Sequence, residues 1–483
     1  MQIFKRIHVF MMMAFIAGLI LSCATNPVTG KKQLMLLSNQ EEIKLGEQSD
    51  GEIVNMYGKY NDPELSRYIA DLGMRMARIS HRPDLPYEFR LLDSPVINAF
   101  AVPGGFVYIT RGILAYLNNE AELAGVMGHE IGHITARHSA QQYTKAQIAQ
   151  LGLGVGMVLS ENFRKYAGVA QFGVGMLFLK FSRDNERQSD ELGVQYSTTV
   201  GYDAMQMANF FETLERMQPK EGGTLPDWFS THPNPADRVV AVRKLATEWE
   251  QKLGKKDYIV ARDEYLRKID GLIYGDDPRQ GFTENNVFYH PDLKFRFNVP
   301  SEWKVTNTPS QVQIVNPQQD AVVMLTMETG LSPAEAAGKF TEKSAAVVLL
   351  SEPVNVNGFQ AQKTLADINS DQGSIRVMSY FIEKDRTIYV LHGFALQTAF
   401  QNYQSAFENS MKSFAKLTDQ KILNVQPDRI WVKKTTRPGN FRDAVVSAGG
   451  DPQKIEELSL INGIKPDATV LTGTTLKIVV KGK

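Results

Sequence analysis

The sequence predicts an α+β protein built from three successive folded segments. Helix periodicity dominates residues 41–255, where apolar side chains recur at steps of three and four. Strand-like β-branched and aromatic runs mark residues 286–416. We therefore expect a mostly helical domain with a small sheet, a linker over residues 256–285, a small α+β domain, and a short module over residues 427–483.

Composition places the chain among ordinary globular proteins. Of its 483 residues, 43% are hydrophobic and 22% are charged, which is enough for several cores. Lysine plus arginine and aspartate plus glutamate each number 53, so the charge balance gives no indication of a nucleic-acid partner.

The N-terminal residues have the pattern of an export signal. Two basic residues precede an apolar run over residues 9–21, which is too short to span a membrane stably. Cys23 follows directly and is the only cysteine, so it cannot form an internal disulfide. We expect residues 1–22 to be a signal peptide and residues 23–40 to be a tether.

Residues 20–23 (Ile-Leu-Ser-Cys) resemble a bacterial lipoprotein box. The resemblance implies cleavage before Cys23, a lipid on that residue, and a periplasmic protein anchored to a membrane. Ala24, where an aspartate would retain such proteins in the inner membrane, implies the outer membrane. A plain signal peptide with an incidental cysteine is the alternative.

An H-E-x-x-H motif is the strongest chemical signal, and it lies in a segment that reads as helix. His129 and His133 are four residues apart, so both rings can reach one metal ion, and Glu130 lies beside them. Zinc with three protein ligands keeps a position for water, and a carboxylate takes the proton during attack on a peptide carbonyl. The motif predicts peptide-bond hydrolysis; an amphipathic helix with two non-catalytic histidines is the alternative.

A third ligand is expected on a later helix. The metzincin pattern is excluded, because it needs a glycine three residues and a histidine six residues after His133, and those positions hold Ala136 and Ser139. Downstream, Glu186 and Asp190 are four residues apart and share a helical face. We expect Glu186 to bind zinc and Asp190 to orient a ligand histidine. Asp184 and Glu191 are rival acids, and a charged helix surface is the alternative reading.

Strand-like residues precede the motif. Asn98, Ala99 and Phe100 begin a run that ends in a Pro-Gly-Gly turn at residues 103–105. They could form an edge strand whose free backbone groups hold an extended substrate. An ordinary hairpin of the core sheet is equally favoured by the pattern.

Several motifs in order resemble the bacterial HtpX-like and BepA-like zinc metallopeptidases, which are related to the CaaX prenyl proteases. The resemblance rests on residues 98–105, 111–114, 119–133 and the pair Arg137-His138, and it extends over residues 23–245. Within that span, Thr25-Asn26-Pro27-Val28-Thr29-Gly30 resembles the start of the family's lipoprotein members.

The resemblance implies a thermolysin-like gluzincin fold with one zinc ion per chain. It places His129, His133 and Glu186 on the metal and makes Glu130 the general base. It also suggests that His232, on a His-Pro loop, fills the fourth position of zinc at rest or contacts the oxyanion, and that Arg238 braces the site. An ordinary surface histidine is the alternative.

Two apolar runs separate the predicted zinc helices. Residues 148–160 and 167–181 are each shorter than the roughly 18 residues that a membrane span needs. We favour a soluble helical hairpin over the cleft, with a transmembrane pair as the alternative.

The C-terminal half offers less chemistry. In the predicted α+β domain we expect helices over residues 333–349 and 400–414, and no titratable cluster stands out, so binding is the default role. Residues 461–479 resemble the second half of a LysM module, which suggests peptidoglycan as a partner, but residues 437–441 depart from the first half.

The function that fits these features best is a zinc endopeptidase of the cell envelope. The family association suggests unfolded or misassembled outer-membrane or periplasmic proteins as substrates, and hence protein quality control. One rival is a largely latent assembly factor or chaperone lipoprotein with a closed zinc site, and another is a cell-wall-binding lipoprotein.

Overall fold

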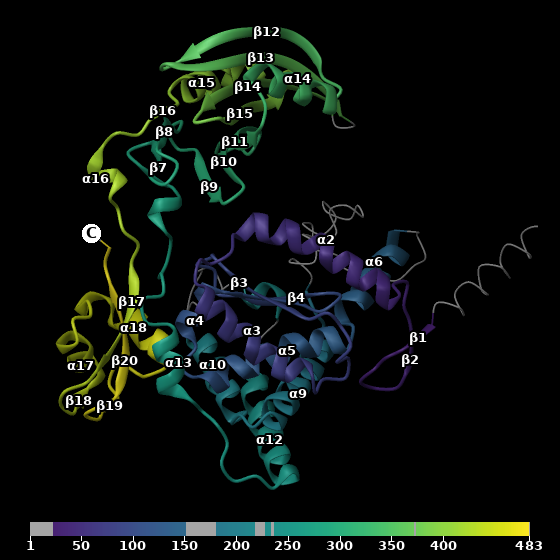
Figure 1. Ribbon diagram of the computed structural model, residues 1–483, viewed down its shortest axis with the longest axis vertical. Coiled ribbons are helices and arrows are strands. Elements are labelled where there is room, and N and C mark those ends of the chain that lie inside the picture. Colours follow the sequence, from purple (N-terminus) through teal and green to yellow (C-terminus); the bar gives the residue numbers. More distant parts are fainter. Residues whose placement is uncertain (1–22, 151–179, 218–227, 233–235, 371–372, 483) are drawn as a thin grey trace, which may run out of the picture. The chain divides into compact units, whose positions relative to one another are not determined.

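The computed structural model describes residues 23–482, apart from residues 151–179, 218–227, 233–235 and 371–372 (Figure 1). The expected signal peptide, and all but the ends of the expected hairpin between the zinc helices, lie outside the described residues. The chain is of the α+β class and divides into two compact units. Unit 1 combines Met1–Gly275 with Asp428–Val480, and unit 2 holds Asp276–Pro427 with Lys481–Lys483.

Unit 1 contains a three-stranded sheet in the order β3-β5-β4, in which β3 runs parallel and β4 antiparallel to β5. Its strands are β3 (Glu88–Leu92), β4 (Ala99–Val102) and β5 (Phe106–Thr110). Around the sheet lie helices α2 (Asn39–Tyr57), α3 (Pro63–Ala77), α4 (Arg111–Tyr116), α5 (Glu120–Thr135), α6 (His138–Gln150), α9 (Arg183–Thr199), α10 (Met205–Arg216), α11 (Trp228–Thr231), α12 (Ala236–Leu253) and α13 (Arg262–Lys268).

The sheet lies between α2 on one side and α3 with α5 on the other (Figure 1). Alternation along β5 explains this layering, because successive side chains of a strand point to opposite faces. Phe106 and Tyr108 pack in the cluster that includes residues of α2, whereas Val107 and Ile109 pack in the large core with α3 and α5.

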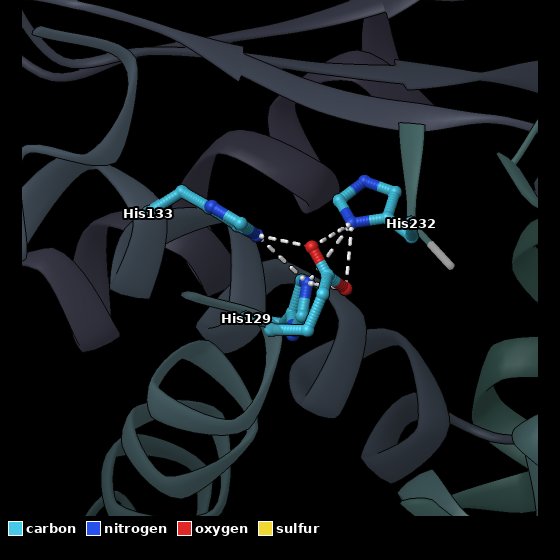
Figure 2. Close-up of side chains that lie close together, drawn as sticks. His129, His133 and His232 are labelled. Carbon is cyan, nitrogen blue, oxygen red and sulfur yellow. Dashed lines mark hydrogen bonds and ion pairs between the residues drawn. The ribbon is translucent and has the colours of Figure 1, made fainter. Parts of the chain in front are cut away.

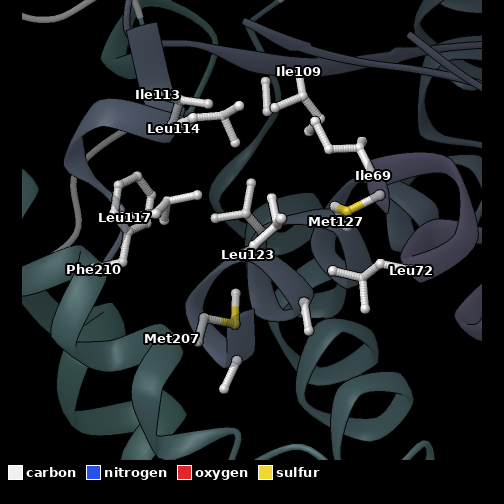
Figure 3. Close-up of a cluster of buried hydrophobic side chains, with 14 of the residues drawn as sticks. Ile69, Leu72, Ile109, Ile113, Leu114, Leu117, Leu123, Met127, Met207 and Phe210 are labelled. Atoms are coloured by element: carbon white, nitrogen blue, oxygen red, sulfur yellow. The ribbon is translucent and has the colours of Figure 1, made fainter. Parts of the chain in front are cut away.

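Helix α5 runs through the centre of this core, and every one of its residues is buried. Asn119 caps it by accepting the Glu122 N–H at 2.8 Å, as the capping rule predicts. Leu123 and Met127 pack among side chains from α3, α10 and the sheet, as Figure 3 shows. The helix that carries the motif is therefore held rigidly from all sides.

Glycines let α9 approach α5 closely. A Cβ built on Gly193 of α9 would lie 3.0 Å from the backbone nitrogen of His129. A Cβ built on Gly128 of α5 would lie 3.0 Å from the backbone oxygen of Gly193. Gly132 is similarly tight against α9, since its Cβ would lie 3.2 Å from Ser189 Cα. This contact brings the acids of α9 beside the histidines of α5.

Two stretches differ from the expected tether and linker. Within residues 23–40, β1 (Cys23–Thr25) pairs with β2 (Lys32–Leu34), and buried Asn26 donates to the Ala136 carbonyl at 3.1 Å. Within residues 256–285, helix α13 buries Tyr265 and Leu266 in the core of unit 1. Both stretches are folded because they supply side chains to that core or hydrogen bonds to its helices.

The C-terminal stretch of unit 1, Asp428–Val480, packs on the N-terminal part of the same unit. It comprises β17 (Arg429–Lys434), β18 (Gly439–Asn440), α17 (Phe441–Ser447), η3 (Pro452–Lys454), α18 (Ile455–Asn462), β19 (Thr469–Val470) and β20 (Thr475–Val480). Lys477 of β20 is fully buried, and its Nζ donates to the carbonyls of Ala115 and Leu117 at 2.8 and 2.7 Å. Lys477 therefore satisfies the last carbonyls of α4, directly before the zinc-motif helix.

Unit 2 is built on a seven-stranded antiparallel sheet in the order β12-β13-β14-β15-β11-β10-β9 and a four-stranded sheet in the order β16-β8-β7-β6. Its elements are η2 (Pro278–Gln280), β6 (Phe282–Glu284), β7 (Val287–His290), β8 (Phe295–Asn298), β9 (Lys304–Thr308), β10 (Gln311–Val315), β11 (Ala321–Thr329), α14 (Pro333–Lys343), β12 (Val347–Val356), β13 (Phe359–Ser370), β14 (Gly373–Lys384), β15 (Thr387–Leu396), α15 (Phe400–Lys412), β16 (Ala415–Lys416) and α16 (Gln420–Leu423).

The helix expected over residues 333–349 is shorter in the structure. It ends at Lys343, and the run Val347–Leu350 belongs instead to β12 at the edge of the large sheet. The β-branched valines favour this strand, and pairing with β13 fixes it.

No helix in the described ranges is long and apolar enough to cross a membrane.

Candidate metal centre

Four side chains from three places in the sequence converge in unit 1. His129 and His133 come from α5, Glu186 from α9, and His232 follows α11 (Figure 2). One ligand atom from each lies within 4.8 Å of the others, and all four residues are buried. Three histidines and a glutamate far apart in sequence thus share one small volume.

The donor atoms point at one another. His133 Nε2 lies 3.0 Å from His129 Nε2 and 3.5 Å from a Glu186 oxygen. His232 Nδ1 lies 3.3 Å from His129 Nε2 and 3.0 Å from Glu186 Oε1. Imidazole nitrogens and one carboxylate are the ligand types that a four-coordinate zinc ion takes, so the residues present fit that metal.

Asp190 and Arg238 hold two members of the cluster, His129 and Glu186, in place. The other ring nitrogen of His129, Nδ1, lies 2.9 Å from Asp190 Oδ1. Arg238 donates to both oxygens of Asp190, at 2.6 and 2.7 Å, and its Nη1 lies 3.1 Å from Glu186 Oε2. Asp190 and Arg238 therefore occupy the places expected for a histidine-orienting carboxylate and a bracing cation.

His133 is held differently. Its Nδ1 lies 3.0 Å from Nδ1 of His138, and His138 Nε2 lies 3.0 Å from Gln188 Oε1. Burial lowers the pKa of His138 to about 4, so its ring is neutral near pH 7. Sequence reasoning quoted His138 within a motif and gave it no role; its position five residues after His133 was the available signal.

Glu130 lies next to the cluster without joining it. Only 1% of the residue is exposed, and its Oε1 has no hydrogen-bond partner among the described residues. His232 Nε2 is likewise unpartnered there and lies 3.7 Å from Glu130 Oε1. Two buried polar atoms thus face each other without hydrogen-bond partners among the described residues. Buried polar atoms are normally paired, so this arrangement fits a site that binds a further polar group or a metal ion.

Burial and neighbouring charges shift the pKa values of Glu130 and Glu186 in opposite directions. Burial raises the pKa of the Glu130 carboxyl well above its usual value, and the nearby Glu186 carboxylate adds to the effect. Burial also acts to raise the pKa of Glu186, but His232, His133 and Arg238 outweigh it and hold that pKa well below its usual value. Glu186 is therefore the ionised partner, and Glu130 is the one suited to carry a proton.

The histidines keep their nitrogen lone pairs. Burial lowers the pKa of His129, although Asp190 opposes it, and burial lowers the pKa of His133 well below its usual value. Neutral imidazole is the form that binds a metal ion.

Aromatic rings that sequence reasoning did not single out line the cluster. Trp228 stacks on His232 with ring centres 4.2 Å apart and an angle of 24°. Phe181 lies against His133 with ring centres 4.1 Å apart. Trp228 precedes His232 by one helical turn, which was the only sequence signal for this stack.

Strand β4 is at the edge of its sheet, as the proposed substrate strand requires. Asn98 precedes it; its N–H donates to Thr110 Oγ1, and its carbonyl accepts from the Thr110 N–H. Ala99 and Phe100 are buried within β4 and pair with β5. The side chains of all three residues face the protein interior, so only backbone groups of this edge could serve an extended ligand.

Residues 63–246 match the family model "Peptidase family M48". The chain is 30% identical over 273 residues to the beta-barrel assembly-enhancing protease of Escherichia coli (strain K12), covering 55% of each chain. It is 32% identical over 158 residues to the mitochondrial metalloendopeptidase OMA1 of Arabidopsis thaliana, covering 33% of this chain and 31% of that protein.

The solution structure of cyanobacterial PsbP from Synechocystis sp. PCC 6803 is similar over 28% of this chain and 91% of its own, with 10% identity and a TM-score of 0.23.

This chain spans about half the length of the beta-barrel assembly-enhancing protease that it matches, 55% of it. The matched range contains the whole cluster of three histidines and a glutamate. Residues 63–246 are thus similar to peptidase family M48, and they contain a buried cluster of histidines and a glutamate of the kind that a metallopeptidase uses to hold its metal.

Proposed function

We propose that this protein is a zinc endopeptidase that hydrolyses peptide bonds of proteins in the cell envelope. The observation that carries the proposal is the buried convergence of His129, His133, Glu186 and His232 beside an unpartnered glutamate, Glu130. His129, His133 and Glu186 would hold one zinc ion. Bound there, zinc would activate water and polarise the scissile carbonyl.

Glu130 would act as the general base and then as the acid. Its carboxyl is buried and has a raised pKa, so it can accept a proton near neutral pH and return it to the leaving amine. Asp190 and Arg238 fix the ring of His129 while this occurs. The backbone edge at Asn98, Ala99 and Phe100 would align the substrate as an added strand.

His232 would close the site at rest. Its Nδ1 already lies among the ligand atoms, where it would occupy the fourth position of the metal. A substrate would have to displace it, so movement of His232 would gate catalysis. Stacking on Trp228 holds the closed position.

The proposed substrates are unfolded or misassembled proteins of the outer membrane or periplasm. The support is the similarity to a protease whose name refers to β-barrel assembly. A lipid on Cys23 would anchor the protein to the outer membrane, and the LysM-like C-terminal stretch would be a candidate contact to peptidoglycan.

A second candidate is an assembly factor whose peptidase is largely latent. The observation that favours it is the complete burial of the cluster, with His232 1% exposed. In this reading the working surface lies outside the cluster, and cleavage is rare.

Replacing Glu130 by Gln separates these functions. Glu130→Gln should bind one zinc ion per chain but cleave no unfolded fluorescent polypeptide, whereas Glu191→Gln, on an exposed position of α9, should match wild type in both. Cleavage by Glu130→Gln at the wild-type rate would refute the mechanism. A metal-replete wild type that binds zinc without cleaving anything would favour the assembly factor.

A further inference from the structure

The two histidines of the motif are supported by groups of different charge. His129 Nδ1 faces the carboxylate of Asp190, which Arg238 holds. His133 Nδ1 faces no carboxylate within hydrogen-bond distance among the described residues; its neighbour is Nδ1 of His138, at 3.0 Å. The second pair needs its own explanation, because a ligand histidine is usually oriented by a hydrogen bond from its other ring nitrogen.

Proton positions follow from the geometry. If Nε2 of His133 gives its lone pair to a metal ion, its Nδ1 carries the proton and must donate it. The acceptor within reach is Nδ1 of His138, which must then be unprotonated. His138 therefore carries its proton on Nε2, and that atom lies 3.0 Å from Gln188 Oε1, which accepts it.

The row of hydrogen bonds from His133 through His138 to Gln188 is thus consistent in its proton positions. Each ring N–H has an acceptor within reach. Ser189 Oγ lies 3.3 Å from the same Nδ1 of His138, so its hydroxyl can share the single lone pair of that nitrogen with the nearer His133 N–H. His138 is fully buried, so its ring nitrogens need hydrogen-bond partners within the protein interior, and these are the ones in reach.

An unusual turn delivers His138 to this place. His138 is the first residue of α6, and Arg137 before it has φ 60°, a left-handed conformation that costs energy for a residue with a side chain. The Arg137 guanidinium stabilises the turn by donating to Glu42 Oε1 at 2.6 Å and to the Leu37 carbonyl at 2.7 Å. The chain therefore reverses direction tightly enough for His138 to lie against His133.

From this arrangement we infer that His138 is a positioning residue for His133, with Gln188 fixing its tautomer. The inference rests on the proposed function, since it concerns how the zinc ligands are held.

The test compares three proteins for zinc affinity, measured by competition with a chromogenic chelator, and for the melting temperature of the metal-free form. His138→Ala removes the acceptor, whereas His138→Asn can place an amide oxygen near the position of Nδ1. We expect zinc binding to weaken about 10- to 100-fold in His138→Ala. His138→Asn should recover most of that loss, while the metal-free melting temperatures of the two variants stay similar.

Equal weakening in His138→Ala and His138→Asn would overturn the inference, because imidazole packing and not the acceptor would then matter. Unchanged zinc affinity in His138→Ala would overturn it as well. Failure of the proposed function is recognised separately, since it would appear as absence of zinc binding in the wild-type protein.

Discussion

Glu130 Oε1 and His232 Nε2 face each other across 3.7 Å, and neither atom has a hydrogen-bond partner among the described residues. Glu130 lies on α5, the helix that carries the motif, and His232 is the residue directly after α11. The proposed base and the proposed gate therefore occupy the same small space, and a substrate carbonyl approaching Glu130 must displace His232.

Removing the gate should raise activity. In His232→Ala the three remaining ligands keep zinc, and the fourth position opens to water and substrate, so we expect cleavage of an unfolded polypeptide to rise severalfold. Zinc content by mass spectrometry or elemental analysis should stay near one per chain. Loss of zinc together with activity would show instead that His232 is an essential ligand.

Glu186 should be essential for metal binding. Glu186→Ala removes the only carboxylate of the cluster and leaves Arg238 Nη1 without its partner, so zinc should be lost and stability should fall by roughly 3–5 kcal/mol, the cost of breaking a buried ion pair. Zinc content and urea unfolding measure these effects. Glu191→Ala, on the exposed side of the same helix, is the control and should change neither.

The glycine contact between α5 and α9 should tolerate no side chain. In Gly193→Ala the new methyl group would lie 3.0 Å from the backbone nitrogen of His129. The backbone of a packed helix cannot move aside as the end of a flexible side chain can. We expect a loss of about 1–3 kcal/mol of stability and weaker zinc binding, because Glu186 moves with α9.

Gly51→Ala is the matched control for that substitution. Gly51 lies within α2, and nothing lies within 4 Å of its added Cβ. Alanine there should stabilise the protein by about 0.5–1 kcal/mol in urea unfolding and leave zinc affinity unchanged. Equal effects of the two substitutions would disprove the close-approach argument.

Unit 2 should lose stability in acid through His392. Burial lowers the pKa of this histidine to about 4, and its Nδ1 lies 2.7 Å from Ser379 Oγ. Since the folded pKa is below the unfolded value, the stabilisation is complete above about pH 6.5 and is lost as the pH falls through about 4. The loss should approach about 3 kcal/mol.

Calorimetry of the unit 2 transition between pH 7 and 3.5 tests this. His392→Gln should unfold with a weaker dependence on pH over that window, while the transition of unit 1 keeps its dependence. The same pH dependence in both proteins would mean that another group is responsible.

Local patterns predicted the centre of unit 1 well because its elements are specified by nearby residues. The i to i+4 spacing fixes the faces of the motif, and the structure shows ordinary side-chain caps at the starts of the helices, Asn119 for α5 and Asp62 for α3. Asp190 could be predicted from the need of a ligand histidine for an acceptor at its other ring nitrogen, whereas only the family resemblance pointed to Arg238.

Features that sequence patterns did not predict depend on contacts between residues that are distant in the sequence. Apolar residues 347–350 continue a helix-like run, and only pairing with β13 makes them a strand. His138 gained its role from a left-handed residue at Arg137, which no propensity indicates. The burial of Tyr265 within a stretch expected to be a linker likewise reflects packing against α5 and its neighbours.

The burial of Lys477 against α4 has a consequence for the order in which the protein is completed. Its Nζ donates to carbonyls just before α5, yet Lys477 is synthesised after Asp276–Pro427, which make up most of unit 2. Arg216 and Ser459 form another contact between the same early and late stretches. During synthesis, the carbonyls of Ala115 and Leu117 therefore lack this donor until β20 has been made.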